Sequence, residues 1–130
     1  MKTLATAILF LSLSTVFAAK SKVMFVTPKD GQTLPQTFEV HFGVEGMTVA
    51  KAGEMKEGTG HHHLIVDGKP VKKGEVVPKD EMHKHFGDGA TSTRVTLPPG
   101  KHTLTLQFAD GAHKSYGEEY SDTITVEVKK

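Results

Sequence analysis

The chain has 130 residues and no cysteine, and its 16 basic side chains nearly balance its 15 acidic ones. Without cysteine it can form no disulfide, no thiolate metal site and no cysteine nucleophile. It also lacks the clustered excess of basic charge that nucleic-acid or membrane-surface binding requires. The unusual feature is histidine, because seven of the eight histidines fall between His61 and His113.

The first 18 residues have the pattern of a secretory signal peptide. Lys2 precedes an apolar stretch over residues 4–13, and the small residues Val16 and Ala18 fit a signal-peptidase site. The stretch is shorter than the ~20 residues that span a bilayer, although an uncleaved anchor is the alternative. We expect cleavage after Ala18. The product is then one periplasmic or secreted bacterial domain, residues 19–130, with no membrane span.

The first half of that domain is predicted to contain two strands. Residues 22–26 form a short apolar run, and Pro28 with the Asp30-Gly31 dipeptide marks a turn after it. Residues 37–44 alternate between apolar and polar side chains, as a half-buried strand does. Residues 45–60 are rich in glycine and have no sustained period, so we expect a long loop there.

The second half is also predicted to be β-structure. A strand begins at three consecutive histidines and ends at the Asp67-Gly68 turn signal, and further strands are expected over residues 93–97, 101–110 and 122–128. Pro-Pro-Gly before residue 101 marks a tight turn. Short alternating strands without a convincing helix predict an all-β fold, an antiparallel immunoglobulin-like β-sandwich.

Strand periodicity divides the three consecutive histidines between two faces. Successive side chains on a strand point to opposite sides, so His61 and His63 share one face and His62 lies on the other. Leu64 and Val66 have the parity of His62, which favours placing His62 toward the core. The outer pair then forms an H-x-H motif, whose two imidazoles are close enough to bind one metal ion.

A second H-x-H motif follows at His83 and His85. The two motifs supply four nitrogen donors, a set that suits zinc or Cu(II). His102 begins a strand directly after a turn, where it is either a ligand at the rim or a histidine bonded to a backbone carbonyl. His113 follows the Asp110-Gly111 turn in a loop that could complete the site.

The sequence carries little that indicates catalysis. It has no G-x-S-x-G nucleophile motif, no phosphate-binding loop and no H-E-x-x-H motif. A metal-dependent oxidoreductase is the enzyme class left open, because copper-zinc superoxide dismutases also place an H-x-H strand in a β-sandwich. The chain lacks their disulfide pair, and its one arginine, Arg94, falls in a predicted strand.

Several sequence blocks resemble a family of small bacterial secreted domains that is catalogued as a domain of unknown function. The blocks are "GTGHHHLIVDG", "HKHFGDGATS", "LPPGKHTLTLQFADGAHKSYG" and "VTPKDGQTLPQTFEVHFGVEGM", which together cover nearly the whole mature chain. The resemblance implies that the signature positions are His61, His62, His63, His83, His85, His102 and His113. It implies a shared histidine site and names no ligand for it.

These observations support a first hypothesis and an alternative. The first is a periplasmic or secreted protein that binds copper or zinc, for storage, delivery or protection, through His61, His63, His83, His85, His102 and His113. The alternative is an immunoglobulin-like structural or adhesion module without metal, with a protein partner in the cell envelope. A metal-dependent oxidoreductase is the third reading.

Overall fold

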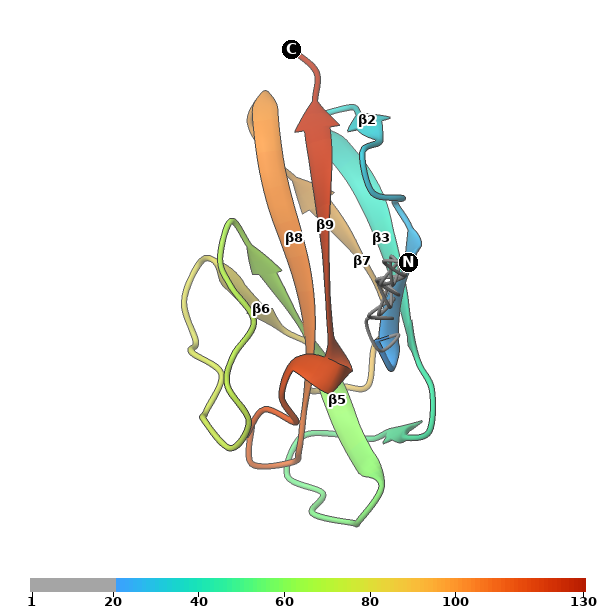
Figure 1. Cartoon of the computed structure of the whole chain (residues 1–130), viewed down its shortest axis with the longest axis vertical. Helices are drawn as coiled ribbons and strands as arrows, with labels where there is room; N and C mark the ends of the chain where they lie inside the picture. Colours follow the sequence, from blue (N-terminus) through green and yellow to red (C-terminus); the bar gives the residue numbers. More distant parts are fainter. Residues whose placement is uncertain (1–20) are drawn as a thin grey trace, which may run out of the picture.

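The computed structural model describes residues 21–130, and the predicted signal segment 1–18 lies outside these residues. The strands of this part of the chain form two layers, joined by loops and one short 3-10 helix (Figure 1). In chain order they are β1 (Val23–Thr27), β2 (Thr33–Leu34), β3 (Thr37–Val44), β4 (Thr48–Val49), β5 (Thr59–Val66), β6 (His83–His85), β7 (Ser92–Thr96), β8 (Gly100–Ala109), η1 (Glu118–Tyr120) and β9 (Ser121–Val128).

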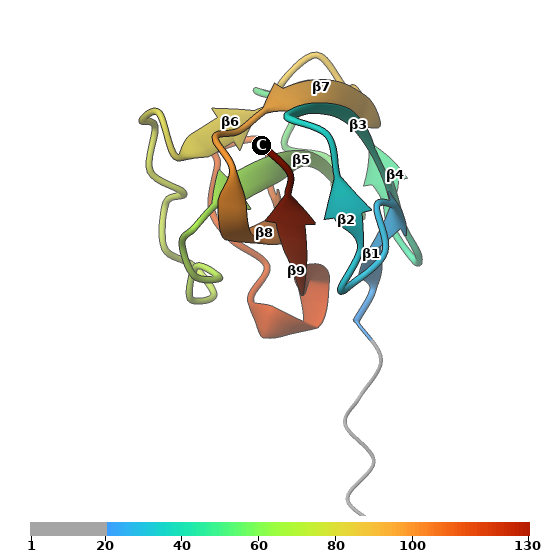
Figure 2. The same ribbon diagram turned by 90° about the horizontal axis from the view of Figure 1, so that it is seen from above.

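The two layers form a β-sandwich, which confirms the predicted fold class at this level. One layer has the strand order β1-β3-β7, and the other has the order β2-β9-β8-β5-β4, with β6 paired to β5. Figure 2 shows β3 and β7 on one side of the molecule and β8 and β9 on the other. The long pairings are antiparallel, as expected. The two-residue pairings β2–β9 and β4–β5 are parallel, which strands this short cannot signal by periodicity.

The predicted strands lie within about one residue of the observed ones. The predicted segment 37–44 coincides with β3, and the predicted segments 93–97 and 101–110 are each displaced by one residue from β7 and β8. Strand β4 lies inside the segment expected to be a loop, 45–60. That segment has no alternation over so short a length, and the pairing with β5 decides the backbone conformation there.

The core lies between the two layers. Alternate residues of β3 contact alternate residues of β5, β8 and β9, and removing such side chains from water stabilises the fold by about 1.5–3 kcal/mol each. The apolar side chains of these four strands that belong to the core cluster are Phe38, Val40, Phe42, Leu64, Val66, Leu104, Leu106, Phe108, Ile124, Val126 and Val128.

Strand β5 differs from its neighbours because it is buried on both faces. All eight residues from Thr59 to Val66 are buried, including the polar ones. The inner face packs into the core, and the outer face lies under the loops that precede β6 and follow β8, while β6 continues the sheet at the edge of β5 (Figure 1). The candidate site lies under this cover. Among residues 21–130 no helix is long and apolar enough to cross a membrane.

Candidate metal centre

The three consecutive histidines divide between the two faces of β5 as strand parity predicts. His62 is fully buried in the core, with its ring centroid 4.6 Å from that of Phe42 and 4.9 Å from that of Phe108. Neither ring nitrogen of His62 has a hydrogen-bond partner among the described residues. His61 and His63 lie on the outer face, where their exposed fractions are 0% and 2%. They face each other with ring centroids 4.7 Å apart.

The outer pair meets two more histidines from separate segments. Strand β6 pairs with β5 in a register that places His85 directly opposite His63. His113 comes from the loop after β8, and its Nδ1 lies 3.1 Å from Nε2 of His61. One ligand atom from each of His61, His63, His85 and His113 lies within 4.8 Å of the others, so this group could hold a metal ion. We call these four residues the histidine cluster.

These spacings suit a single metal ion. Nitrogen ligands bind zinc at about 2.0–2.1 Å, so two ligands of one tetrahedral ion lie about 3.3 Å apart. The 3.1 Å separation between His61 and His113 is close to that value. The centroid of the His113 ring also lies 4.6 Å from that of His85. Because the ligand atoms of all four residues lie within 4.8 Å of one another, a single ion is within reach of the whole cluster.

The loop carrying His113 is held by the aspartate that begins it. Oδ1 of Asp110 accepts the backbone N–H groups of Ala112 and Lys114, and His113 itself adopts a positive φ of 64°. Gly111 permits the turn to touch a second loop, because a Cβ there would lie 2.2 Å from the backbone oxygen of Glu54. The Asp-Gly turn signal thus predicted the loop correctly. The hydrogen bonds accepted by Asp110 explain how the loop directs His113 back toward β5.

Gln107 joins the two loops that cover the cluster. It lies opposite His63 on β8, is fully buried, and accepts the backbone N–H of Val71 at 3.0 Å. Its Nε2 donates to the carbonyl oxygen of Gly117 at 3.0 Å. The backbone N–H of Val77 then donates to the carbonyl oxygen of His113. Gln107 was not identified from the sequence. A signal was available, because its position in the strand places its side chain on the face opposite to that of the inward residues.

Gly87 gives the ring of His85 its position. A Cβ at this residue would lie 2.2 Å from Cε1 of His85 and 3.0 Å from the Cβ of Ala52. The backbone around it is fixed, since Ala52 donates its N–H to the carbonyl oxygen of Gly87 at 2.9 Å. A side chain at this position would therefore push the imidazole of His85 away from the cluster.

The environment keeps the two buried histidines of the cluster, His61 and His63, uncharged near neutral pH. Burial lowers the pKa of His61 to about 4 and that of His63 to about 3, and repulsion between the neighbouring imidazolium charges adds to both effects. Burial also lowers the pKa of His85. Neutral imidazole is the form that ligates metal, so the lone pairs are available without loss of a proton.

Buried nitrogen atoms provide a further indication. Nδ1 of His61 and Nδ1 of His63 are buried and have no hydrogen-bond partner within residues 21–130. An unpaired buried polar atom is costly, and such atoms in a native protein often mark an ion or a water site. The donor set is four imidazoles without carboxylate or thiolate, and imidazole nitrogen is a ligand for several transition-metal ions.

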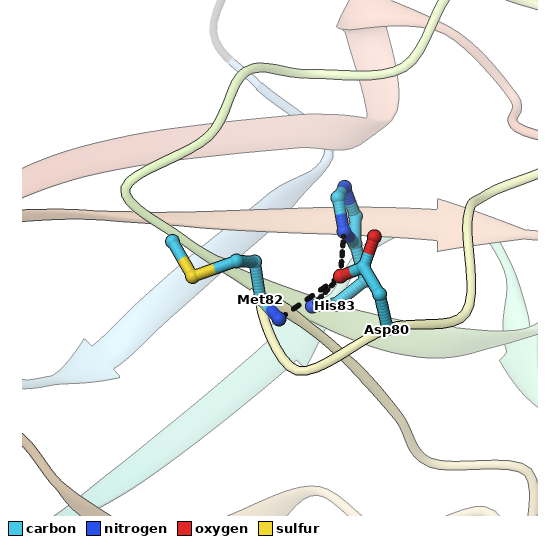
Figure 3. Close-up of polar contacts among 3 residues, drawn as sticks. All are labelled: Asp80, Met82 and His83. Carbon is cyan, nitrogen blue, oxygen red and sulfur yellow. Dashed lines mark hydrogen bonds and ion pairs between the residues drawn. The ribbon is translucent and has the colours of Figure 1, made fainter.

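His83 lies outside the cluster. It pairs with Ile65 in the β5–β6 register, two residues away from the pair that His85 forms with His63. Its Nδ1 contacts Oδ1 of Asp80 at 2.7 Å, and the same oxygen accepts the backbone N–H groups of Met82 and His83 (Figure 3). The ring of His83 is thus bound by Asp80 in the turn before β6. The second H-x-H motif contributes one histidine to the group and not two.

His102 is the other predicted ligand that the structure does not bring to the cluster. It lies at the start of β8, whereas His61 pairs with Ala109 at the end of that strand. At about 3.3 Å per residue these positions are roughly 23 Å apart. Nδ1 of His102 lies 2.8 Å from Oδ2 of Asp67, and Nε2 lies 2.8 Å from the carbonyl oxygen of Pro98. Of the two roles considered for this residue, the structure shows the bond to a backbone carbonyl.

The family model described as "Domain of unknown function (DUF4399)" matches residues 40–129, a range that contains the whole histidine cluster. The chain belongs to this family. Membership in DUF4399 confirms the resemblance seen in the sequence and adds no activity to it. None of the curated proteins matches the chain.

A solved structure similar to this DUF4399 protein is that of the endo-β-1,4-mannanase from Thermotoga petrophila. The two chains are 18% identical, with a TM-score of 0.49. The alignment covers 88% of this chain and 21% of the mannanase, so the chain spans about a fifth of that enzyme's length.

Proposed function

We propose that this protein binds one copper or zinc ion through His61, His63, His85 and His113, in the periplasm or outside the bacterial cell. The observation that carries the proposal is the convergence of four imidazoles from three separate segments onto one point, where His61 and His63 are buried, His113 is half-buried and His85 is exposed. Packing alone does not require it, because an apolar residue at each buried position would avoid the cost of desolvating an imidazole. A bound ion compensates that cost.

The donor set and its surroundings suggest the role. Four nitrogen ligands without thiolate suit zinc or Cu(II), and the sequence carries no catalytic motif, so the proposed role is storage, delivery or protection. His83 and His102 are not included in the proposed ligand set, because Nδ1 of each ring contacts an aspartate carboxylate. The covering loops, joined through Gln107, hold the site in place before the metal arrives.

Calorimetric titration of the untagged protein with Cu(II) and with Zn(II) tests the proposal. We expect one equivalent of metal to bind, and binding to be lost in the double variant His61→Ala, His63→Ala. The matched control is His83→Ala, which removes a histidine two residues from His85 and should leave the affinity unchanged. Binding no tighter than that of the buffer, or full binding by the double variant, would contradict the proposal.

Thermal unfolding gives a second measurement of the same interaction. A ligand bound only by the folded state at 100 times its Kd stabilises the protein by about 2.7 kcal/mol, which raises the melting temperature by several degrees. A structural or adhesion module without metal predicts no such rise. The double variant should melt at one temperature with and without the ion.

The location is tested by expressing the chain with its own N-terminal segment. We expect the protein in the periplasmic or extracellular fraction, with the mass of residues 19–130. Recovery of the uncleaved chain from the membrane or cytoplasmic fraction would contradict this part of the proposal.

A further inference from the structure

A cavity opens beside the histidine cluster. Its volume is about 150 Å³, and its wall includes His63, His85 and His113. The rest of the wall is the short segment 76–79, of which Val77 is buried and Lys79 is exposed. His61 does not line it. Three of the four proposed ligands therefore border an empty space on one side of the cluster, while the fourth is covered by protein.

We propose that the metal ion bound here keeps one coordination position open toward this cavity and takes a small anion there. This inference rests on the proposed metal site. A cavity of about 150 Å³ is large enough for a ligand the size of benzene, so an anion of three or four atoms fits it. Cu(II) and zinc both accept a fifth ligand when a position is free. His63, which is 2% exposed and retains an unpartnered nitrogen, forms part of the wall.

The charge of the wall selects an anion. Lys79 is the formally charged residue in the lining, which contains no carboxylate. It lines the cavity together with His63, His85 and His113, so its charge lies beside the proposed ligands. The negative charges of Asp88 and Asp110 act on His85 and His61 respectively, and neither carboxylate lines the cavity. An anion entering the cavity meets the metal charge and one further positive charge.

The test uses the copper-loaded protein and azide as the probe. Azide bound to Cu(II) is followed by a new charge-transfer absorption band and by a change in the EPR spectrum. We expect a saturable response, with the copper content unchanged after dialysis. In Lys79→Gln the azide affinity should fall about threefold to tenfold, the range expected for the loss of one nearby charge. The matched control is Lys101→Gln, which removes an exposed lysine at the far end of β8.

Val77→Phe provides a second variant that fills the cavity. It should abolish the azide response while one equivalent of copper still binds. If this variant does not fold, Lys79→Gln still tests the proposal, because that residue is exposed.

The outcomes separate this inference from the metal site itself. Failure of the wild-type protein to bind copper overturns both. Normal copper binding with no spectral response to azide overturns only the open position. Removal of copper by azide also overturns it, and equal azide affinities in the wild type and Lys79→Gln overturn the assignment of Lys79.

Discussion

Histidines next to the two ends of β8 are in opposite chemical states: His61 and His63 of β5 pair with the end of β8, and His102 lies at its start. At one end, burial lowers the pKa values of His61 and His63 to about 4 and about 3. At the other end, the hydrogen bond with Asp67 raises the pKa of His102. Both ring nitrogens of His102 face acceptors, a carboxylate and a carbonyl, so these partners favour the imidazolium, the form in which both nitrogens donate.

The difference shows that the partners, and not the residue type, decide what a histidine can do. Burial, helped by neighbouring histidines, keeps His61 and His63 neutral and suited to a metal. His102 has anionic and carbonyl partners, which keeps it charged and suited to fixing a turn. The following predictions separate the two regions by measurement.

The largest expected effect is an acid-induced loss of stability in the metal-free protein. The folded state holds the pKa values of His61, His62 and His63 at about 4, 4 and 3, whereas each is 6.5 in the reference state. Below pH 6.5 the unfolded chain binds more protons, so the free energy of unfolding falls as pH falls toward 4. Between pH 7 and 5 we expect a loss of about 2 kcal/mol for a group such as His62.

Urea unfolding at pH 7, 6 and 5 measures this loss, over a range in which most carboxylates stay ionised. Replacing His102 should leave this acid-side slope in place. A free energy of unfolding that does not change over this range would show that the buried histidines are not held neutral.

Removing the buried core histidine should stabilise the fold. His62 is fully buried and neither of its ring nitrogens has a partner within residues 21–130, and such a group costs about 1–3 kcal/mol. His62→Leu should therefore raise the free energy of unfolding at pH 7 by about that amount and leave metal affinity unchanged. The same variant should reduce the acid-side slope. A stability loss in His62→Leu would mean that His62 makes a bond the fold needs.

A methyl group at Gly87 should weaken the metal site without unfolding the protein. The added Cβ would collide with the His85 ring at 2.2 Å, so that ligand must move. We expect metal affinity to fall about tenfold, which corresponds to about 1.4 kcal/mol. Gly43→Ala is the matched control, since a Cβ there meets its nearest atom, a side-chain carbon of Met24, at 3.7 Å. Calorimetric titration of both variants would contradict the assignment of His85 if their affinities were equal.

The smallest effect is expected at His102. A raised pKa in the folded state contributes stability that is fully present below pH 6.5 and is lost as pH rises through the folded value. His102→Phe should cost about 1 kcal/mol at pH 6 and less at pH 9, with unchanged metal affinity. Urea unfolding at the two pH values measures this difference. An equal cost at both would show that the ring acts only through packing.

Much of the strand arrangement could be predicted, because it depends on local alternation. Residues 37–44 alternate over eight positions, and β3 occupies that range. The same parity placed His62 in the core and the outer pair on the other face of β5. The short strands β2, β4 and β6 lack such a signal, and contacts with longer strands define them.

The candidate site could be predicted in part. The four residues of the cluster are among the six proposed from the sequence, and their binding of a metal stays a prediction. His83 has the same H-x-H spacing as His61, yet Asp80 contacts its ring from three residues earlier. The H-x-H spacing indicates which residues share a face of a strand. It does not indicate which neighbouring group each histidine ring contacts.

The sequence by itself determined that the chain forms a sandwich of alternating strands with two histidines on one face of β5, because side-chain direction repeats every two residues. Only the tertiary structure decided that His85 and His113 join them, and that His83 and His102 bind aspartates instead. That outcome depends on the β5–β6 register and on the loops joined by Gln107, contacts between residues distant in the chain. Such contacts follow from packing of the whole molecule, which no local pattern encodes.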